Sequence, residues 1–282
     1  MLILSQLVVL CLFNQFAYIE KSTEMNVRDL RLFLLTFLFI SSLTSGCLSD
    51  SVDENEVSLV VEQERTNGTI IESYSNGEHV STTSVSLEFD FSKTVSDGKL
   101  NTFGLDPGDG RDSITVDPSK TDTISIEFSN HGIYEMIAYA VDEYGQRVEI
   151  PIMVRIELRI EWSESNTYEP KALTINPIPL NGGDSPESII IDSTVENPVL
   201  VENLGGGREV EITWRLLDPQ DDACQSRKGI VHEGESANWK TIHFSTHEIH
   251  ELTLSYDEGQ DEIDVNHVIS IEYSHPESES ES

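Results

Sequence analysis

Three histidines lie close together near the C-terminal end of the chain, His243, His247 and His250, with two glutamates among them. Imidazole and carboxylate groups are common zinc ligands. The spacing differs from His-Glu-x-x-His, which places two histidines on one face of a helix. If a strand runs from His247 to Tyr256, His247 and His250 point to opposite faces and cannot share an ion. We therefore expect surface histidines, and keep an envelope hydrolase or metal-dependent accessory protein using this region as the alternative function.

A second set with metal-binding chemistry is the aspartate series Asp106, Asp109 and Asp112. Hard cations such as Ca²⁺ bind clustered carboxylates, but this spacing does not fit a calcium loop of about twelve residues. Gly108 and Gly110, on either side of Asp109, favour a tight turn in which the carboxylate accepts backbone N–H groups. We expect turn chemistry first, keep Ca²⁺ at these aspartates as a weak metal candidate, and expect no other cofactor.

No set of side chains has the pattern of a catalytic site. The tripeptide 183–185, Gly-Asp-Ser, resembles one hydrolase nucleophile motif, but Pro186 follows it and no strand-turn-helix surrounds it. The glycines at 205–207 lead into a strand-like run, so they lack the helical amides of a phosphate cradle. Cys224 lies in a polar stretch without a histidine-partnered nucleophile pattern, which favours an incidental thiol in a loop. We expect no catalytic residue and no enzyme.

Strand-like alternation dominates the segments that position these side chains. Polar and apolar residues alternate in 85–91 and 124–128, as in strands with one buried face. The pair Asn67-Gly68 lies between β-rich runs and predicts a tight hairpin turn. Because Thr69 follows, Asn67 also begins a glycosylation sequon and is a candidate glycosylation site in a host that glycosylates exported proteins.

Three short elements follow one another in this region. They are Asp106 with Gly108, Asp109 and Gly110, then Gly132 with Tyr134, then Val141 with Asp142 and Gly145. Their order resembles the polycystic-kidney-disease (PKD) type domain, whose hallmark reads Trp-Asp-Phe-Gly-Asp-Gly. Here Leu105 stands in place of the tryptophan and Pro107 in place of the phenylalanine. The resemblance covers roughly residues 76–158. It implies a β-sandwich related to immunoglobulin domains, with contacts to proteins or carbohydrates.

The clearest periodic signal is the run Val148–Trp162, in which every even position is apolar and most odd positions are charged. Strict alternation indicates a strand with one buried face. At ~3.3 Å per residue the run is about 50 Å long, more than one ordinary strand. We expect one strand that ends a first sandwich and continues into a second, with the domain boundary near Glu157.

After this run, short β-rich segments alternate with turn clusters, which is typical of a second all-β sandwich. The segments are 188–191, 198–201, 210–214, 252–256 and 268–271. Trp162, Trp214 and Trp239 fall in this part, and we expect them in its core. The predicted fold is all-β, with two tandem immunoglobulin-like β-sandwiches. The predicted parts are a PKD-like sandwich at 57–157, a second sandwich at 158–274 and an acidic disordered tail at 275–282.

The chain is strongly acidic, with a formal net charge of −34. Such a surface repels nucleic acid and anionic headgroups, so nucleic acid is not an expected partner. High acidity also suits salty surroundings, where screening shortens to ~3 Å at 1 M. We expect a solvated acidic surface rather than a ligand site made of acids.

The N-terminal part of the sequence indicates the localisation of the protein. Arg28 and Arg31 precede an apolar run at 32–40, and small residues follow before Cys47, as in export signals. The sequence Leu-Thr-Ser-Gly-Cys at 43–47 resembles the lipobox of prokaryotic lipoproteins, with threonine where the family usually has leucine. In that family lipid is attached to the cysteine sulfur and the signal is cut before it. The resemblance implies lipidation at Cys47. The expected parts are an upstream extension at 1–24 before a start at Met25, a signal peptide at 25–46 and an acidic spacer at 47–56.

These observations together predict a membrane-tethered, outward-facing lipoprotein at the cell surface. It would act as a non-catalytic binding, adhesion or spacer module. Its partners would be the membrane, through the lipid anchor, and an extracellular protein or carbohydrate ligand.

Overall fold

The computed structural model describes residues 57–199 and 208–274, and this part of the chain is all-β without a helix. Predictions for the N-terminal segments, Cys47 and the acidic tail therefore lie outside the described residues. In chain order the strands are β1 (Val57–Ser58), β2 (Glu62–Gln63), β3 (Asn67–Ser75), β4 (Glu78–Thr83), β5 (Val85–Asp90), β6 (Val95–Ser96), β7 (Leu100–Asp106), β8 (Ile114–Val116), β9 (Thr123–Phe128), β10 (Gly132–Asp142), β11 (Arg147–Thr167), β12 (Leu173–Ile175), β13 (Ser188–Glu196), β14 (Glu209–Leu217), β15 (Ala223–His232), β16 (Ser236–His243), β17 (His250–Glu258) and β18 (Ile263–Glu272).

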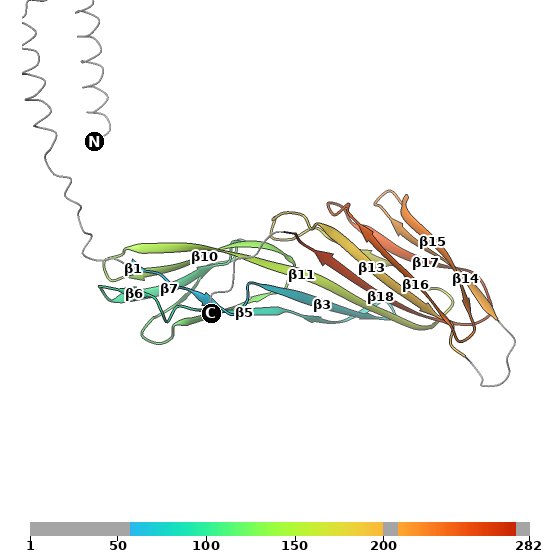
Figure 1. The fold of residues 1–282 in the computed structure, drawn as a ribbon, viewed down its shortest axis with the longest axis horizontal. Helices are drawn as coiled ribbons and strands as arrows, with labels where there is room; N and C mark the ends of the chain where they lie inside the picture. The colour runs from blue at the N-terminus through green and yellow to red at the C-terminus, as the bar shows by residue number, and fades with distance from the viewer. Residues whose placement is uncertain (1–56, 200–207, 275–282) are drawn as a thin grey trace, which may run out of the picture. The chain divides into compact units, whose positions relative to one another are not determined.

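Strand β11 joins the two sandwiches, as its alternation predicts (Figure 1). Its first half pairs with β10 up to Ile156, and its second half pairs with β18 from Leu158. Strand β3 pairs in parallel with Arg155–Ser163, which overlaps both partners, so β3 occupies the opposite edge. Strands β10 and β18 therefore follow one another along the same edge of β11. The pairing of β11 changes from β10 to β18 beside Glu157, the position at which we expect the domain boundary. The division of the chain into two domains stays a prediction.

The first sandwich packs the β2-β5-β9 sheet against the β10-β7-β8 part of the large sheet. Phe91, just after β5, stacks on Phe103 of β7 with ring centroids 4.9 Å apart. Phe128 of β9 meets Tyr134 of β10 edge-on at 4.6 Å. The alternating runs predicted as strands form β5 and β9, and their apolar side chains fill this core.

The second sandwich packs the β12-β17-β14-β15 sheet against β16, β13 and β18 of the large sheet. Its three tryptophans are all buried, which confirms the sequence prediction. Trp214 of β14 is fully buried, and its ring centroid lies 6.3 Å from that of Trp239 on β16. The contact between these two rings crosses from one sheet to the other.

The predicted hairpin turn at Asn67-Gly68 is wrong, because both residues lie inside β3. Gly68 has a packing role instead: a Cβ atom there would come within 2.5 Å of a methyl group of Val85. The Asn-Gly pair that does make a turn is Asn76-Gly77, between β3 and β4, with φ angles of 50° and 80°. Positive φ at two adjacent residues is what a tight hairpin turn requires.

Of the segment expected as a strand at 198–201, residues 200 and 201 lie outside the described residues. Strand β13 ends at Glu196, and residues 197–199 are irregular. Asn197 is fully buried and its amide donates to the carbonyl oxygens of Val231 at 3.2 Å and Arg208 at 3.4 Å. Pro198 follows and cannot donate to a β ladder. Both features end the strand.

Candidate functional site

The end of β7 and the loop after it carry two of the three predicted calcium ligands, Asp106 and Asp109, in turn geometry. Asp106 Oδ1 accepts the Gly108 N–H at 3.0 Å, and Asp109 Oδ1 accepts the Arg111 N–H at 3.1 Å. Gly108 and Gly110 have φ angles of 71° and 86°, which favour glycine. Asp112 is exposed, and the three aspartates are not a convergent ligand group among the described residues. The turn chemistry is confirmed, whereas Ca²⁺ binding stays a prediction.

Tyr134, near the start of β10, fixes the chain that precedes it. Its hydroxyl donates to the carbonyl oxygen of Asn130 at 2.6 Å. A tyrosine bonded back to the backbone a few residues upstream is the tyrosine corner of immunoglobulin-like sandwiches. Burial, followed by the nearby charge of Asp109, raises the pKa of Tyr134 to about 12. The hydroxyl therefore keeps its proton and its bond.

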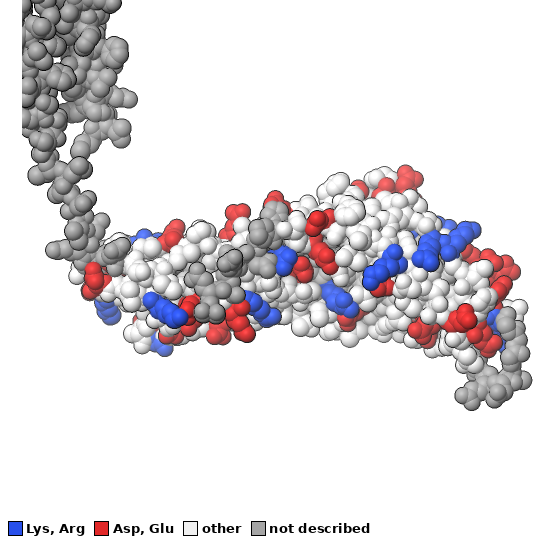
Figure 2. All heavy atoms as spheres, viewed as in Figure 1, with Lys and Arg blue, Asp and Glu red and all other residues white. Residues whose placement is uncertain are grey.

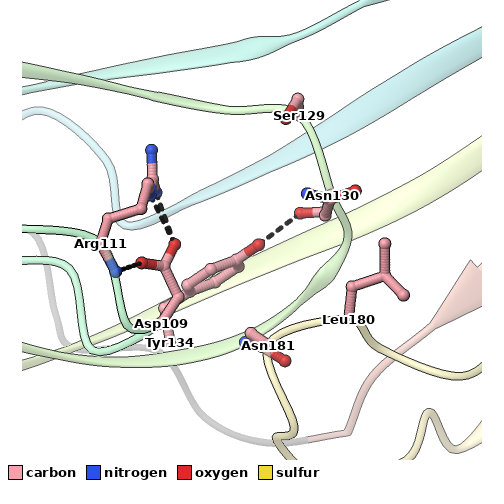
Figure 3. A pocket seen from close by; sticks show the side chains of 7 residues that line it. All are labelled: Asp109, Arg111, Ser129, Asn130, Tyr134, Leu180 and Asn181. Atoms are coloured by element: carbon pink, nitrogen blue, oxygen red, sulfur yellow. Dashed lines mark hydrogen bonds and ion pairs between the residues drawn. The ribbon is translucent and has the colours of Figure 1, made fainter.

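Beside this tyrosine lies a polar pocket of about 180 Å³ (Figure 3). It is lined by Asp109, Arg111, Ser129, Asn130, Tyr134, Leu180 and Asn181. Arg111 Nε donates to Asp109 Oδ2 at 2.7 Å, and the guanidinium lies over the ring of Phe128. Burial acts to raise the pKa of Asp109, but the hydrogen bonds and charge of Arg111 outweigh it and leave this pKa below its usual value. The pocket thus presents a charge-balanced ion pair.

The wall opposite the ion pair comes from the segment between β12 and β13. Asn181 Nδ2 donates to the carbonyl oxygen of Ile133 at 2.7 Å, and Asn181 Oδ1 accepts the Gly183 N–H at 3.0 Å. Gly132 leaves room for this amide, since a Cβ there would lie 2.7 Å from Asn181 Nδ2. Leu180 projects beside them and is 74% exposed. The sequence pattern did not identify these residues, because the segment meets β10 only in the folded chain.

A second pocket of about 310 Å³ adjoins the polar one and shares Ser129, Asn130 and Leu180 with it. Its remaining lining comes from β3, His131, β11, β12 and the segment after β12, and it combines apolar with polar side chains. These residues are Ile70, Glu72, Tyr74, His131, Leu158, Ile160, Thr174, Asn176 and Ile178. Tyr74 stacks on Trp162 with centroids 5.6 Å apart. We call the two pockets together the groove.

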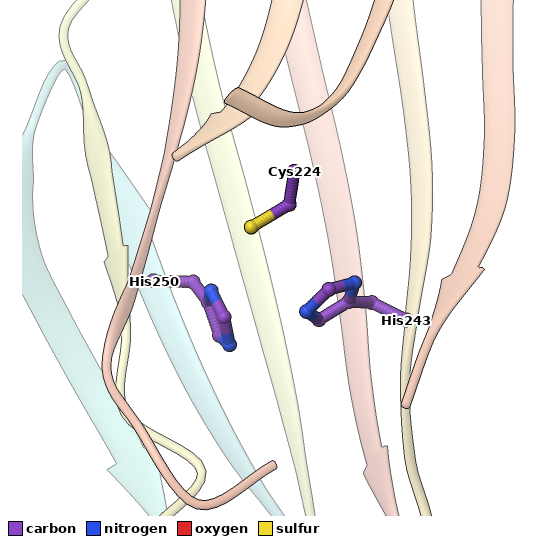
Figure 4. Close-up of side chains that lie close together, drawn as sticks. All are labelled: Cys224, His243 and His250. Atoms are coloured by element: carbon purple, nitrogen blue, oxygen red, sulfur yellow. The ribbon is translucent and has the colours of Figure 1, made fainter. Parts of the chain in front are cut away.

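The sequence predicts surface histidines near the C-terminal end, but His250 is buried and its ring lies beside that of His243 (Figure 4). Strand β17 begins at His250, so His247 precedes it and is exposed. His243, at the end of β16, meets His250 with ring centroids 4.6 Å apart. Cys224 joins them, and one donor atom of each of these three residues lies within 4.8 Å of the others.

Cys224 lies in β15 rather than in the polar loop expected from its neighbours. Leu216 of β14 pairs with Gln225 and Leu217 pairs with Ala223, so Cys224 is the extra residue of a β-bulge. A bulge re-aims a side chain out of the regular alternation. Most residues of β15 are exposed, so no apolar pattern signals this strand in the sequence.

The polar environment of the histidine pair is asymmetric. His250 is 1% exposed, and its Nε2 lies 2.7 Å from the carbonyl oxygen of Ser245. The pKa of His243 is lowered by burial and then by His250, against an opposing effect of Glu248. The pKa of Cys224 is raised by burial and by the charges of Asp218 and Glu248. Acidic charge therefore lies near both Cys224 and His243.

Asn67, the candidate glycosylation residue, is the first residue of β3 and is half-buried. Its position in a strand paired with β11 differs from the exposed turn that the sequon suggests. Glycosylation of Asn67 stays a prediction.

No protein-family model matches the chain, and no curated protein matches it. Among solved structures it is similar to a chain from work on promiscuous carbohydrate-binding modules of the β-sandwich superfamily, with 10% identity, 77% of this chain and 97% of that chain covered, and a TM-score of 0.28. It is similar to SGBP-B of the Bacteroides ovatus mixed-linkage glucan utilization locus, with 10% identity, 73% and 52% covered, and a TM-score of 0.19. A Bacillus endospore appendage protein matches with 14% identity, 42% and 86% covered, and a TM-score of 0.21. These superpositions are too loose to carry an argument about function.

Within residues 57–199 and 208–274, no helix has the length and apolar character needed to cross a membrane. Acidic and basic side chains are interspersed over the face of the described part shown in Figure 2.

Proposed function

We propose that the chain is a non-catalytic binding module, tethered to the outer face of a membrane through lipid on Cys47, and that it binds carbohydrate in the groove. The observation that carries the binding proposal is the continuity of the two pockets, which share Ser129, Asn130 and Leu180. One end of the groove is polar, and the other combines apolar and polar side chains. Concave sites with few, fixed polar groups and apolar walls are typical of ligand pockets.

Carbohydrate suits this distribution of side chains. A sugar ring carries hydroxyl groups around its edge and C–H groups on its faces. Asp109, Arg111, Asn130 and Asn181 supply acceptors and donors of planar geometry for vicinal hydroxyls. Ile178 and Leu180, 40% and 74% exposed, offer apolar contact to the C–H face. Because Asp109 is paired with Arg111, the polar end of the groove favours a neutral glycan over a charged ligand.

The polar end of the groove is already organised without ligand. Tyr134 holds the Asn130 carbonyl, Asn181 is bonded to Ile133, and Arg111 is bonded to Asp109 and to the carbonyl oxygen of Glu127 at 2.9 Å. Groups fixed in advance lose little conformational entropy on binding. In these bonds the Tyr134 hydroxyl donates its proton to Asn130 and the Asp109 carboxylate accepts from Arg111. Neither group is then free to act as an acid or a base, so the site suits binding better than catalysis by proton transfer.

The binding proposal is tested with the full chain in detergent micelles, on a panel of neutral and acidic oligosaccharides followed by titration calorimetry. Asn130→Ala and Leu180→Ser change exposed side chains that line the groove, and we expect each to weaken binding about tenfold. Asn266→Ala, at an exposed position of β18 outside the groove, is the matched control and should bind as the parent chain does. Absence of any neutral glycan ligand, or equal affinity of parent and Asn130→Ala, would overturn the proposal.

The tether is tested separately by Cys47→Ser in cells. If lipid on this cysteine is the sole anchor, the protein moves from the membrane fraction into the medium. Retention in the membrane fraction would contradict the lipid anchor and indicate an uncleaved hydrophobic segment.

A further inference from the structure

Cys224, His243 and His250 come from three strands and two sheets, yet their donor atoms converge. Cys224 and His250 belong to β15 and β17 of the four-stranded sheet, and His243 ends β16 of the large sheet. The sulfur atom and one nitrogen of each ring lie within 4.8 Å of one another. Figure 4 shows the three side chains directed into the same space.

Two ring nitrogens in this cluster are buried and have no hydrogen-bond partner, Nδ1 of His250 and Nε2 of His243. Such unpartnered buried atoms are rare in folded proteins. The carbonyl oxygen of Ser245 can only accept, so the 2.7 Å contact places the proton of neutral His250 on Nε2. Its Nδ1 then carries a free lone pair. A histidine held by a carbonyl at one nitrogen, with the other nitrogen free, is the usual arrangement of a metal ligand.

We propose that Cys224 Sγ, His243 Nε2 and His250 Nδ1 form a binding site for Zn²⁺. One thiolate and two imidazoles are soft and borderline donors, which suit Zn²⁺ and disfavour Ca²⁺ and Mg²⁺. Bond lengths of about 2.3 Å to sulfur and 2.0–2.1 Å to nitrogen place tetrahedral donors roughly 3.3–3.6 Å apart. The described separations are all within 4.8 Å, so small side-chain rotations, for which the exposed Cys224 has the most freedom, bring the donors into this range. On binding, the thiol proton leaves to solvent and the sulfur becomes a thiolate ligand.

The surroundings of the cluster favour a cation. Glu248 acts electrostatically on both His243 and Cys224, and Asp218 and Asp222 act on Cys224. Three protein ligands leave a fourth position of the tetrahedron for water or for a carboxylate such as that of Glu248. The metal would also connect β15 and β17 to β16, and thereby hold the two sheets together at this end of the second sandwich.

The test uses the full chain, stripped of metal by chelation under reducing conditions, and titrated with Zn²⁺ and with Co²⁺ as a spectroscopic probe. We expect one equivalent of Co²⁺ to give a sulfur-to-metal charge-transfer band that Zn²⁺ abolishes. At a Zn²⁺ concentration about 100-fold above Kd, the melting temperature should rise by about 5–10 °C. Cys224→Ala should remove the charge-transfer band, because in the proposed mature protein Cys11 has been removed and the sulfur of Cys47 carries lipid.

His243→Ala changes a half-buried ligand at the end of β16, whereas His247→Ala removes an exposed histidine of the loop that follows and is the matched control. The first should abolish the zinc-dependent rise in melting temperature, and the second should leave it unchanged. Circular dichroism of each metal-free variant checks that it folds. If His243→Ala does not fold, the charge-transfer band of Cys224→Ala still tests the proposal. Absence of a charge-transfer band in the parent chain, or a band that persists in Cys224→Ala, would overturn the proposal. Glycan binding is measured separately and does not depend on this outcome.

Discussion

The indole nitrogen of Trp214 donates a hydrogen bond of 2.7 Å to the hydroxyl of Ser193, from one sheet of the second sandwich to the other. The same hydroxyl lies 2.8 Å from Nδ1 of His267. All three side chains are buried. The Ser193 hydroxyl therefore links two buried rings: it accepts from Trp214, and it forms a second hydrogen bond with His267 Nδ1 in which either atom can donate.

Ser193→Ala should destabilise the protein by about 2–3 kcal/mol, because it leaves two buried polar atoms without a partner. Urea unfolding followed by tryptophan fluorescence measures this loss. Ser226→Ala, at an exposed position of β15, is the matched control and should change the free energy of unfolding by less than about 0.5 kcal/mol. Equal stabilities of the two variants would contradict a structural role of the Trp214–Ser193 bond.

Stability should fall as the pH is lowered from about 6.5 to about 4. Burial lowers the pKa of His267 from 6.5 to about 4 in the folded protein. The unfolded chain therefore binds a proton first, and stability decreases through this window by about 3 kcal/mol from this group. The contribution is fully present above pH 6.5.

This dependence is measured by urea unfolding between pH 4 and pH 7.5 for the parent and for His267→Gln. The variant should lose this part of the slope while keeping the part that carboxylates contribute. Parallel curves for the two proteins would show that His267 does not titrate as the fold predicts.

The strands that carry the core could be predicted because apolar and polar residues alternate along them, and the apolar positions are the buried ones. β11 is the clearest case, since its even positions face the core from Ile152 to Trp162. β15 could not be predicted in this way, because most of its side chains are exposed and its pairing with β14 contains the bulge at Cys224. The turn chemistry of Asp106 and Asp109 is equally local, and the sequence predicts it correctly.

The candidate sites depend on contacts between segments that are distant in sequence. The alternation of apolar and polar residues within one segment does not predict such contacts. Leu180 and Asn181 meet the β9–β10 connection only after both sandwiches form. His243 and His250 come from β16 and β17 of different sheets, and the strand considered from His247 to Tyr256 begins only at His250. The mistaken turn at Asn67-Gly68 has the same origin, since the reason for glycine is the distant side chain of Val85.

Gly68→Ala should therefore destabilise the first sandwich by about 1–3 kcal/mol, because the added Cβ lies 2.5 Å from Val85 Cγ1. A double-mutant cycle with Val85→Ala isolates this overlap. In the Val85→Ala background the same glycine substitution should cost much less, and the coupling energy should be at least about 0.5 kcal/mol. Additive effects would mean that the two residues do not limit each other's packing.

Tyr134→Phe should reduce stability by about 1–2 kcal/mol, because the carbonyl of Asn130 loses its donor while the ring contact with Phe128 is kept. The same change frees the Ser129–Asn130 segment, which both pockets of the groove share. If the groove binds glycan, the affinity should fall even under conditions where the variant is fully folded, because the segment must then be ordered on binding. Thermal unfolding and calorimetric titration, made on the same sample, separate the two effects. Tyr144→Phe, at an exposed tyrosine of the β10–β11 turn, is the control and should change neither quantity. If Tyr134→Phe loses stability but binds glycan as tightly as the parent, the tyrosine corner contributes to folding and not to glycan recognition.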